Sequence, residues 1–266
     1  MQIRRVRLFF ILPFLPLFTS TVKAQLSPPG LDGAKLVSWA AIGVNQKISN
    51  RWSTTVYVGG SSQSDPDNLS TLKKPAIFVL NQETLFQFTP NWQLALCTSL
   101  RYQFQYEDDA PYSKEDPPWK REIRYYLRMF YRYQNGPVAW SHSFRPEYRT
   151  FFEPNGKPWS SPEQFRFRLK SQANISINNA KTNFIVVANE VLAATAENST
   201  GQWSSLQFTE DRLSTFFRHA VAKPSLFIDL GLMHQFWLDK NQQMQYTTYL
   251  SVDFLFQNPL TKIKKP

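Results

Sequence analysis

The chain has 266 residues, of which 42% are hydrophobic and 15% aromatic, and its formal net charge is +10. This length is sufficient for a full domain, while a mean hydropathy of -0.40 excludes a bundle of membrane-spanning helices. The composition is compatible with a transmembrane β-barrel, because such barrels alternate apolar and polar residues along each strand.

The N-terminus has the pattern of a secretory signal peptide. Arginines within the first seven residues precede an apolar run at 8–18, and Val22 and Ala24 follow as the small residues that signal peptidase prefers. The apolar run is much shorter than the ~20 residues that a spanning helix needs. We therefore predict that residues 1–24 are a cleaved signal peptide and that residues 25–266 are exported across the inner membrane.

The clearest strand pattern runs from Trp92 to Tyr106. Its residues alternate between a set that is almost entirely apolar or aromatic and a set that is polar or small. This alternation continues far beyond the about 5–6 residues of a typical strand in a soluble protein. Such a pattern is typical of a transmembrane strand that turns its apolar face to lipid and its polar face to the lumen.

Similar alternation predicts further strands along the chain. The expected strands lie at 34–48, 51–59, 74–88, 92–106, 120–134, 138–152, 164–178, 182–195, 206–218, 225–238 and 244–256. Short turns alternate with longer polar loops at 60–73, 107–118, 153–163 and 196–205, which matches the short periplasmic turns and long external loops of bacterial barrels.

The number of predicted strands is odd, whereas bacterial single-chain barrels usually have an even number. An even number would mean that the predicted strands include one strand divided in two, include two strands joined as one, or omit one strand. We therefore predict an all-β fold, an antiparallel up-and-down transmembrane β-barrel of 10–12 strands in the bacterial outer membrane.

Asn135-Gly136 predicts a two-residue type I′ hairpin turn, because both positions must tolerate positive φ. This turn fixes the register of the strands on either side of it. On the polar face it places Arg124 opposite Glu147 and Glu122 opposite Arg149. We therefore predict two cross-strand charge pairs inside the barrel.

Charged residues on later strands have the same inward parity. The predicted charge cluster of the lumen is Glu122, Arg124, Arg128, Arg145, Glu147, Arg149, Arg166, Arg168, Glu190 and Arg212. Guanidinium groups bind carboxylates and phosphates, so this cluster is one candidate site for anionic ligands or for the passage of small anionic solutes. The other interpretation is structural, with Arg-Glu ladders that fill and lock a narrow barrel.

Two residues conflict with the simple strand pattern. Pro146 faces lipid and removes a ladder hydrogen bond, so we predict a β-bulge there. A two-residue turn before its strand would place Glu190 opposite Leu169 and toward lipid, where a carboxylate is costly. A shift of one residue places Glu190 opposite Arg168 or Lys170, and we predict this inward arrangement.

No histidine forms a catalytic pair within its own strand. Lipid hydrolases of the outer membrane place His and Ser two residues apart on one face, so that the imidazole can take the hydroxyl proton. His142, His219 and His234 lack a serine at that spacing, and Ser141 and Ser143 point to the opposite face from His142. No catalytic residue is assigned, and a lipid-modifying enzyme with residues paired across strands remains the alternative function.

The sequence predicts no cofactor and no metal site. Acidic residues gather at 107–109 and at 115–116, but their spacing fits no known calcium loop and indicates a solvated external loop. Nucleic acid is not an expected partner, because the predicted basic charges are interior. The expected partners are outer-membrane lipid, the barrel-insertion machinery during biogenesis and small anionic solutes.

Five motifs spread over the chain carry a family resemblance. They are the Trp39 strand with Gly43-Val44-Asn45-Gln46-Lys47, Arg145-Pro146-Glu147-Tyr148-Arg149, Phe165-Arg166-Phe167-Arg168-Leu169, Asn189-Glu190-Val191 and Thr209-Glu210-Asp211-Arg212. In this order they resemble the domain-of-unknown-function 2490 family, found in secreted proteins of the Bacteroidetes type. The resemblance implies a small outer-membrane barrel and lends no catalytic residues.

Overall fold

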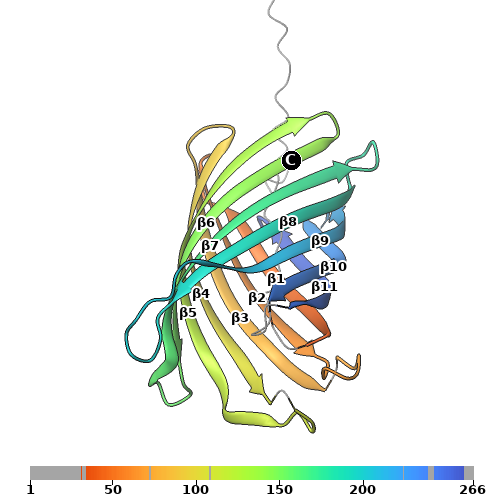
Figure 1. Ribbon diagram of the computed structural model, residues 1–266. Coiled ribbons are helices and arrows are strands. Elements are labelled where there is room, and N and C mark those ends of the chain that lie inside the picture. The colour runs from red at the N-terminus through yellow and green to blue at the C-terminus, as the bar shows by residue number, and fades with distance from the viewer. Residues whose placement is uncertain are drawn as a thin grey trace, which may run out of the picture.

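The computed structural model describes residues 31, 34–71, 73–107, 109–223, 225–238 and 243–260. In this part of the chain, eleven strands close into one barrel (Figure 1). They are β1 (Leu36–Lys47), β2 (Trp52–Gln63), β3 (Lys74–Gln87), β4 (Trp92–Tyr106), β5 (Lys114–Asn135), β6 (Val138–Phe152), β7 (Pro158–Ser176), β8 (Asn183–Ala196), β9 (Gln207–Val221), β10 (Leu226–Leu238) and β11 (Met244–Gln257). The predicted signal peptide, residues 1–24, lies outside the described residues.

The strands are long, from 12 residues in β1 to 22 residues in β5. A membrane-spanning strand needs ~9–11 residues, so each of these strands is long enough to cross the hydrocarbon core of a bilayer. Within the described residues, no helix has the length and hydropathy needed to cross a membrane.

The barrel closes through a parallel pair. Every strand is antiparallel to its sequence neighbours, whereas β1 runs parallel to β11 from the pair Leu36 and Thr248 to the pair Asn45 and Gln257. In an up-and-down barrel the first and last strands point the same way only when the strand number is odd. The prediction of 10–12 strands is confirmed at eleven, and the expectation of an even number is wrong.

Three strands extend further into the long loops than the sequence predicts. β2 continues to Gln63, beyond its predicted end at Gly59. β5 begins at Lys114 and β7 at Pro158, so the loops that precede these strands are shorter than predicted. The first three residues of β5 are exposed and charged, and the two prolines that follow are half-buried, so this stretch has no apolar alternation. The alternation therefore marks only the middle of these strands, and it misses their ends.

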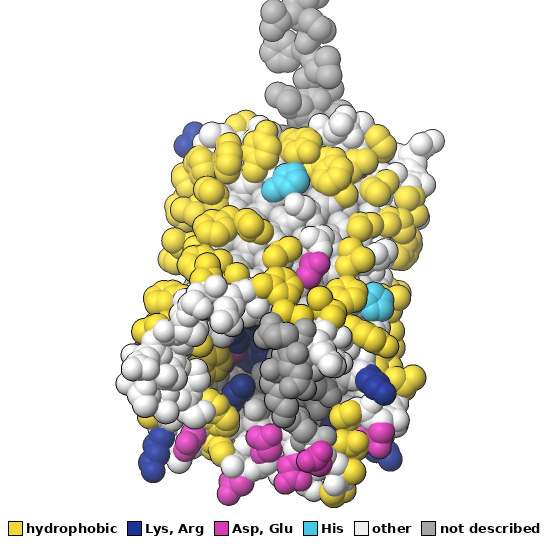
Figure 2. Space-filling view, in the orientation of Figure 1, with side chains coloured by type: hydrophobic (Ala, Val, Ile, Leu, Met, Phe, Trp, Pro, Cys, Tyr) yellow, Lys and Arg dark blue, Asp and Glu magenta, His cyan; other side chains and the backbone are white. Residues whose placement is uncertain are grey.

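The wall of the barrel is apolar outside and polar inside. On β4, Gln93 and Ser99 are buried, while Leu94 and Leu96 are 41% and 66% exposed. Hydrophobic side chains cover much of the outer face, and charged side chains gather at the lower end in this view, where the longer loops lie (Figure 2). This distribution is the reverse of a soluble globular protein, in which charged residues are almost never fully buried unless paired.

The β5–β6 hairpin has a different turn from the predicted one. Gly136 and Pro137 form the turn, with φ of +58° at Gly136, and Asn135 pairs with Val138. In the predicted turn Pro137 would have to donate a backbone hydrogen bond, which it cannot do because it has no N–H. The register moves by two residues, so each side chain keeps its predicted face but changes its partner.

Pro146 produces no bulge. The pairing between β5 and β6 lapses around Pro146 and resumes in the same register, and Pro146 also keeps its place opposite Phe167 in β7. The missing N–H therefore interrupts the ladder without shifting it, and the predicted bulge is wrong.

One side of the interior is apolar. A buried cluster comprises Leu31, Ala34, Val37, Trp39, Ala41, Ala76, Ile77, Val79, Met233 and Tyr249. Leu31 precedes β1 and lies against the inner wall: its N–H donates to Gln235 Oε1 over 3.1 Å, and its carbonyl accepts from Thr247 Oγ1 over 3.3 Å. Leu31 and Ala34 thus fill part of this side of the barrel.

Candidate functional site

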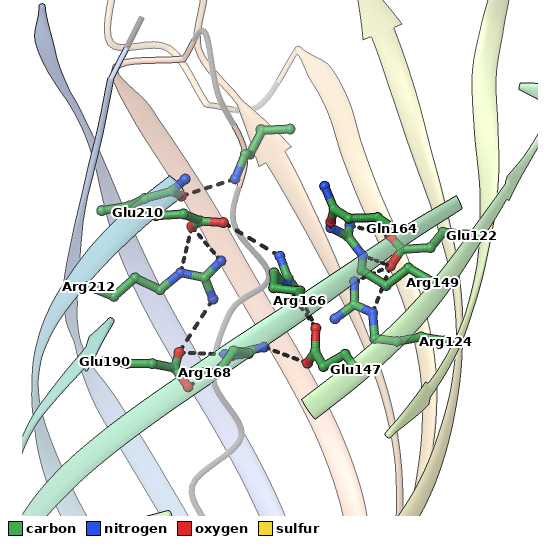
Figure 3. Close-up of polar contacts among 12 residues, drawn as sticks. Glu122, Arg124, Glu147, Arg149, Gln164, Arg166, Arg168, Glu190, Glu210 and Arg212 are labelled. Atoms are coloured by element: carbon green, nitrogen blue, oxygen red, sulfur yellow. Dashed lines mark hydrogen bonds and ion pairs between the residues drawn. The ribbon is translucent and has the colours of Figure 1, made fainter. Parts of the chain in front are cut away.

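The candidate site is the charged part of the interior, between β4 and β9. Each predicted charge lies on one of these strands and points into the barrel, where the labelled arginines and glutamates face one another (Figure 3). The predicted residues are Glu122, Arg124 and Arg128 on β5, Arg145, Glu147 and Arg149 on β6, Arg166 and Arg168 on β7, Glu190 on β8 and Arg212 on β9. We call these residues and their ion-pair partners the charge network.

Glu147 is the central acceptor of the charge network. Arg166 Nε donates to its Oε2 over 2.7 Å, Arg168 Nη1 approaches its Oε1 at 3.3 Å, and Arg145 forms a third ion pair. The predicted cross-strand pair of Glu147 with Arg124 is wrong, because the shifted register places Tyr126 opposite Glu147. One buried carboxylate thus joins two adjacent strands through three guanidinium groups.

Glu122 is a second acceptor, on β5. Arg149 donates to both of its oxygens, over 2.6 and 3.0 Å, and Arg124 Nε donates to Oε1 over 2.7 Å. The predicted contact between Glu122 and Arg149 therefore forms, although Arg149 lies opposite Arg124 and not opposite Glu122. Arg101 of β4 approaches the same carboxylate at 3.8 Å.

Glu190 faces the interior, as predicted. It lies opposite Lys170, forms an ion pair with Arg168 and lies 3.7 Å from Arg212. Arg212 also donates to Glu210 over 2.6 Å, which extends the charge network to β9. The inward position removes the cost of a carboxylate in lipid.

Several interior acids lie outside the predicted charge cluster. Glu83 of β3 lies 3.3 Å from Arg128 and accepts a hydrogen bond from Cys97 Sγ over 3.4 Å. Asp229 of β10 and Asp253 of β11 are also buried and lie opposite each other. The alternation along each strand places all three acids on the inward face. Each of them, however, has only neutral neighbours in the sequence, so no charge pattern draws attention to it.

The charge network carries a surplus of positive charge. Among the described residues, eight arginines and five glutamates form its ion pairs, which leaves three positive charges in excess. All of these side chains are at most 16% exposed. Guanidinium groups bind carboxylates and phosphates, so this excess of arginine over glutamate would favour an anion in the lumen.

Ionic contacts also join two loops at the end of the barrel where the longer loops lie. Lys74 Nζ forms an ion pair with Asp65 after β2 and donates to the carbonyl of Tyr112 after β4 over 2.7 Å. The hydrogen bond from Lys74 lowers the pKa of Asp65 below its ordinary value. Lys74 therefore holds these two loops together at one mouth of the barrel.

The described residues contain no group of three or more His, Cys, Asp or Glu side chains placed to hold a metal ion. The charge network itself consists of guanidinium and carboxylate groups. Guanidinium forks match the planar oxygens of carboxylate and phosphate groups, and they retain their charge at all physiological pH values.

Comparison with known proteins identifies a family. A family model described as a protein of unknown function, DUF2490, matches residues 37–246, a region that includes the whole charge network. No curated protein matches the sequence. The resemblance inferred from the five sequence motifs is thereby confirmed.

Proposed function

The chain belongs to the DUF2490 family, whose function is unknown, and we propose that it is an outer-membrane barrel that binds small anionic groups and passes small anionic solutes slowly. The proposal has two parts, the membrane location and the role of the interior. Different observations support each part.

The outer surface supports the membrane location. Large apolar side chains such as Leu96, Tyr125 and Leu169 are 56–66% exposed on neighbouring or nearby strands. Soluble monomers rarely expose apolar patches larger than a few hundred Å², whereas a lipid-facing wall requires them. The predicted signal peptide would direct the chain across the inner membrane to the insertion machinery.

The surplus of three positive charges in the charge network is the observation that carries the anionic specificity. Among the described residues, the ion pairs of the charge network contain eight arginines but five glutamates. A small carboxylate or phosphate would relieve this imbalance through charge-assisted hydrogen bonds.

Single-channel conductance of the refolded protein in a planar bilayer tests this role. We expect a low conductance that prefers anions, with a weaker preference in Arg124→Ala and a stronger preference in Glu147→Gln, because these changes remove a positive and a negative charge. Lys157→Ala alters an exposed loop cation and serves as the control. Heat-modifiable gel migration would show that each variant is folded.

A silent bilayer with folded protein would contradict passage of solutes and favour the purely structural ladder. A cation-preferring conductance would contradict the anionic specificity. Equal behaviour of the wild type and both charge variants would show that the charge network lies outside the path.

A further inference from the structure

A row of polar side chains crosses the outer wall from β6 to β9. His142 lies opposite Ser171, and Ser171 lies opposite Asn189. His142 Nδ1 is 3.0 Å from Ser171 Oγ, and Asn189 Nδ2 donates to Asp211 Oδ1 over 2.6 Å. On each strand, the residues directly before and after these four point into the barrel. The four residues therefore point outward, away from the charge network.

The surroundings of this row are apolar. Ser171 and Asn189 are exposed, and His142 and Asp211 are half-buried. On each strand, a residue two positions away from the polar one is apolar and exposed. These apolar residues are Phe144, Leu169, Val191 and Leu213. Polar groups on a lipid-facing wall are costly, and they point to a functional site by default.

We propose that His142, Ser171 and Asn189 form a site that hydrolyses acyl esters of membrane lipids. This site rests on the membrane location proposed above and is separate from the anion-binding interior. Substrate would reach it laterally from the bilayer, because the row lies on the outer wall.

The depth of the site suits an ester substrate. The ring of His142 stacks with Trp140, at 6.1 Å between centroids and 8° between planes, and with Tyr133 at 5.9 Å. Trp and Tyr gather at the level of lipid headgroups, where the ester groups of glycerolipids also lie and water is available. The two aromatic rings also hold the imidazole in place beside the serine.

The reaction follows from the order of the side chains. Ser171 Oγ attacks the ester carbonyl carbon while His142 takes its proton, and the alcohol leaves with that proton as the ester C–O bond breaks. Water then attacks the acyl-serine and gives its proton to His142. The carboxylic acid leaves, and Ser171 Oγ regains its proton.

Asn189 lies on the other side of Ser171 from the histidine. A side-chain amide has two N–H donors, and Asp211 accepts from one of them. The second can stabilise the oxyanion that forms on the carbonyl oxygen. Asp211 is a positioning residue, because it fixes the amide of Asn189 and does not touch the ester.

The protein contains a matched control pair. His234 Nδ1 and Thr248 Oγ1 are also 3.0 Å apart, on β10 and β11. Thr248 lies opposite Leu36 on its other side, so this pair has no amide donor in the position of Asn189. The His142 site differs from it by its primary hydroxyl and its oxyanion donor.

The test uses the full mature barrel folded into phospholipid vesicles, with release of labelled fatty acid and covalent labelling by a fluorophosphonate as readouts. We expect hydrolysis by the wild type and a label on Ser171, mapped by mass spectrometry. Ser171→Ala should abolish the label and lower the rate by about 10²–10⁴-fold, and His142→Asn should lower the rate by a similar factor. Thr248→Ala should change neither readout.

Folded, inserted wild type that neither hydrolyses lipid nor takes the label would overturn the proposal. Hydrolysis by Ser171→Ala at the wild-type rate would also overturn it. Failure to insert into vesicles would instead contradict the membrane location, so the two proposals fail in distinguishable ways.

The supporting residues provide a second test. Asn189→Ala should lower kcat by about 10²–10³-fold, the usual effect of losing one oxyanion donor. Asp211→Ala should lower kcat and leave KM unchanged, and Asp211→Asn should restore activity because it keeps an acceptor oxygen for Asn189. Equal losses in both Asp211 variants would refute the positioning role.

Discussion

The interior of the barrel has two sides that are held together by different forces. Between β4 and β9, arginines and glutamates form ion pairs beside a smaller apolar cluster on β4 and β5, whereas β1, β3, β10 and β11 line the interior with apolar side chains packed against Leu31. The apolar side resembles the core of a soluble protein. A solute path, as proposed above, therefore runs along the charged side.

Acidic residues mark the border between the two sides. Asp253 Oδ1 accepts a hydrogen bond from Trp39 Nε1 over 2.9 Å, and Asp229 binds Arg218 through both oxygens, over 2.7 and 2.6 Å. Trp39 thus belongs to the apolar cluster through its ring and to the polar interior through its N–H. Changes on either side of this border should have different sizes and different causes.

The largest effect is expected for Glu147→Ala on the charged side. Glu147 is 2% exposed and holds three arginines, which would be left buried without their shared partner. Removing one partner of a buried ion pair costs 3–5 kcal/mol, and we expect a loss of about 5 kcal/mol in the free energy of unfolding. Urea unfolding followed by gel migration measures it.

Glu115→Ala is the control for this change, because Glu115 is exposed near the beginning of β5. Its free energy of unfolding should stay within about 0.5 kcal/mol of the wild type. If Glu147→Ala were equally mild, water or ions would screen the charge network, and the comparison of the two sides would fail.

On the apolar side, Trp39→Phe should cost about 2 kcal/mol. Phenylalanine keeps much of the ring packing but cannot donate to the buried Asp253, and an unsatisfied buried acceptor costs about 1–3 kcal/mol. The same urea titration measures this loss. A neutral substitution would mean that Asp253 finds another donor, so that the hydrogen bond does not join the two sides.

Gly59→Ala tests the packing of the apolar side alone. A Cβ at Gly59 would lie 2.5 Å from the ring of Trp39, so we expect a loss of about 1–2 kcal/mol from overpacking. Gly60→Ala is the matched control, because its Cβ would have no neighbour nearer than 3.7 Å. In a Trp39→Phe background the Gly59→Ala cost should fall, and equal costs in both backgrounds would refute the contact as its cause.

The sequence predicts the charged side better than the apolar side. Strand parity was enough to place Glu122, Arg124 and Glu147 inside, because alternation fixes the face of each residue. It did not fix their partners, since the register depended on whether Pro137 or Asn135 entered the turn. A shift of two residues in the register between β5 and β6 keeps every side chain on its predicted face but gives each residue a different cross-strand partner.

The apolar side could not be predicted by the same rule. Val37, Trp39 and Val79 point inward, whereas the barrel pattern assigns apolar residues to the lipid face. Their burial depends on Leu31, which is not part of a strand and has no alternation to reveal its position. Likewise, the outward pair of His142 and Ser171 comes from two strands, so spacing within one strand could not identify it.

Asp253→Asn should produce the smallest change, and its sign is informative. Asparagine keeps an acceptor oxygen for Trp39 and removes one of two carboxylates that lie opposite each other. Opposed like charges are destabilising, by about 0.2–1 kcal/mol for a cross-strand pair, so we expect the variant to equal the wild type or to gain up to about 1 kcal/mol. Urea titrations of the variant and the wild type in parallel measure the difference. A loss greater than about 2 kcal/mol would show that the negative charge of Asp253 is itself needed, and the border between the two sides would then be held by charge and not by the hydrogen bond of Trp39.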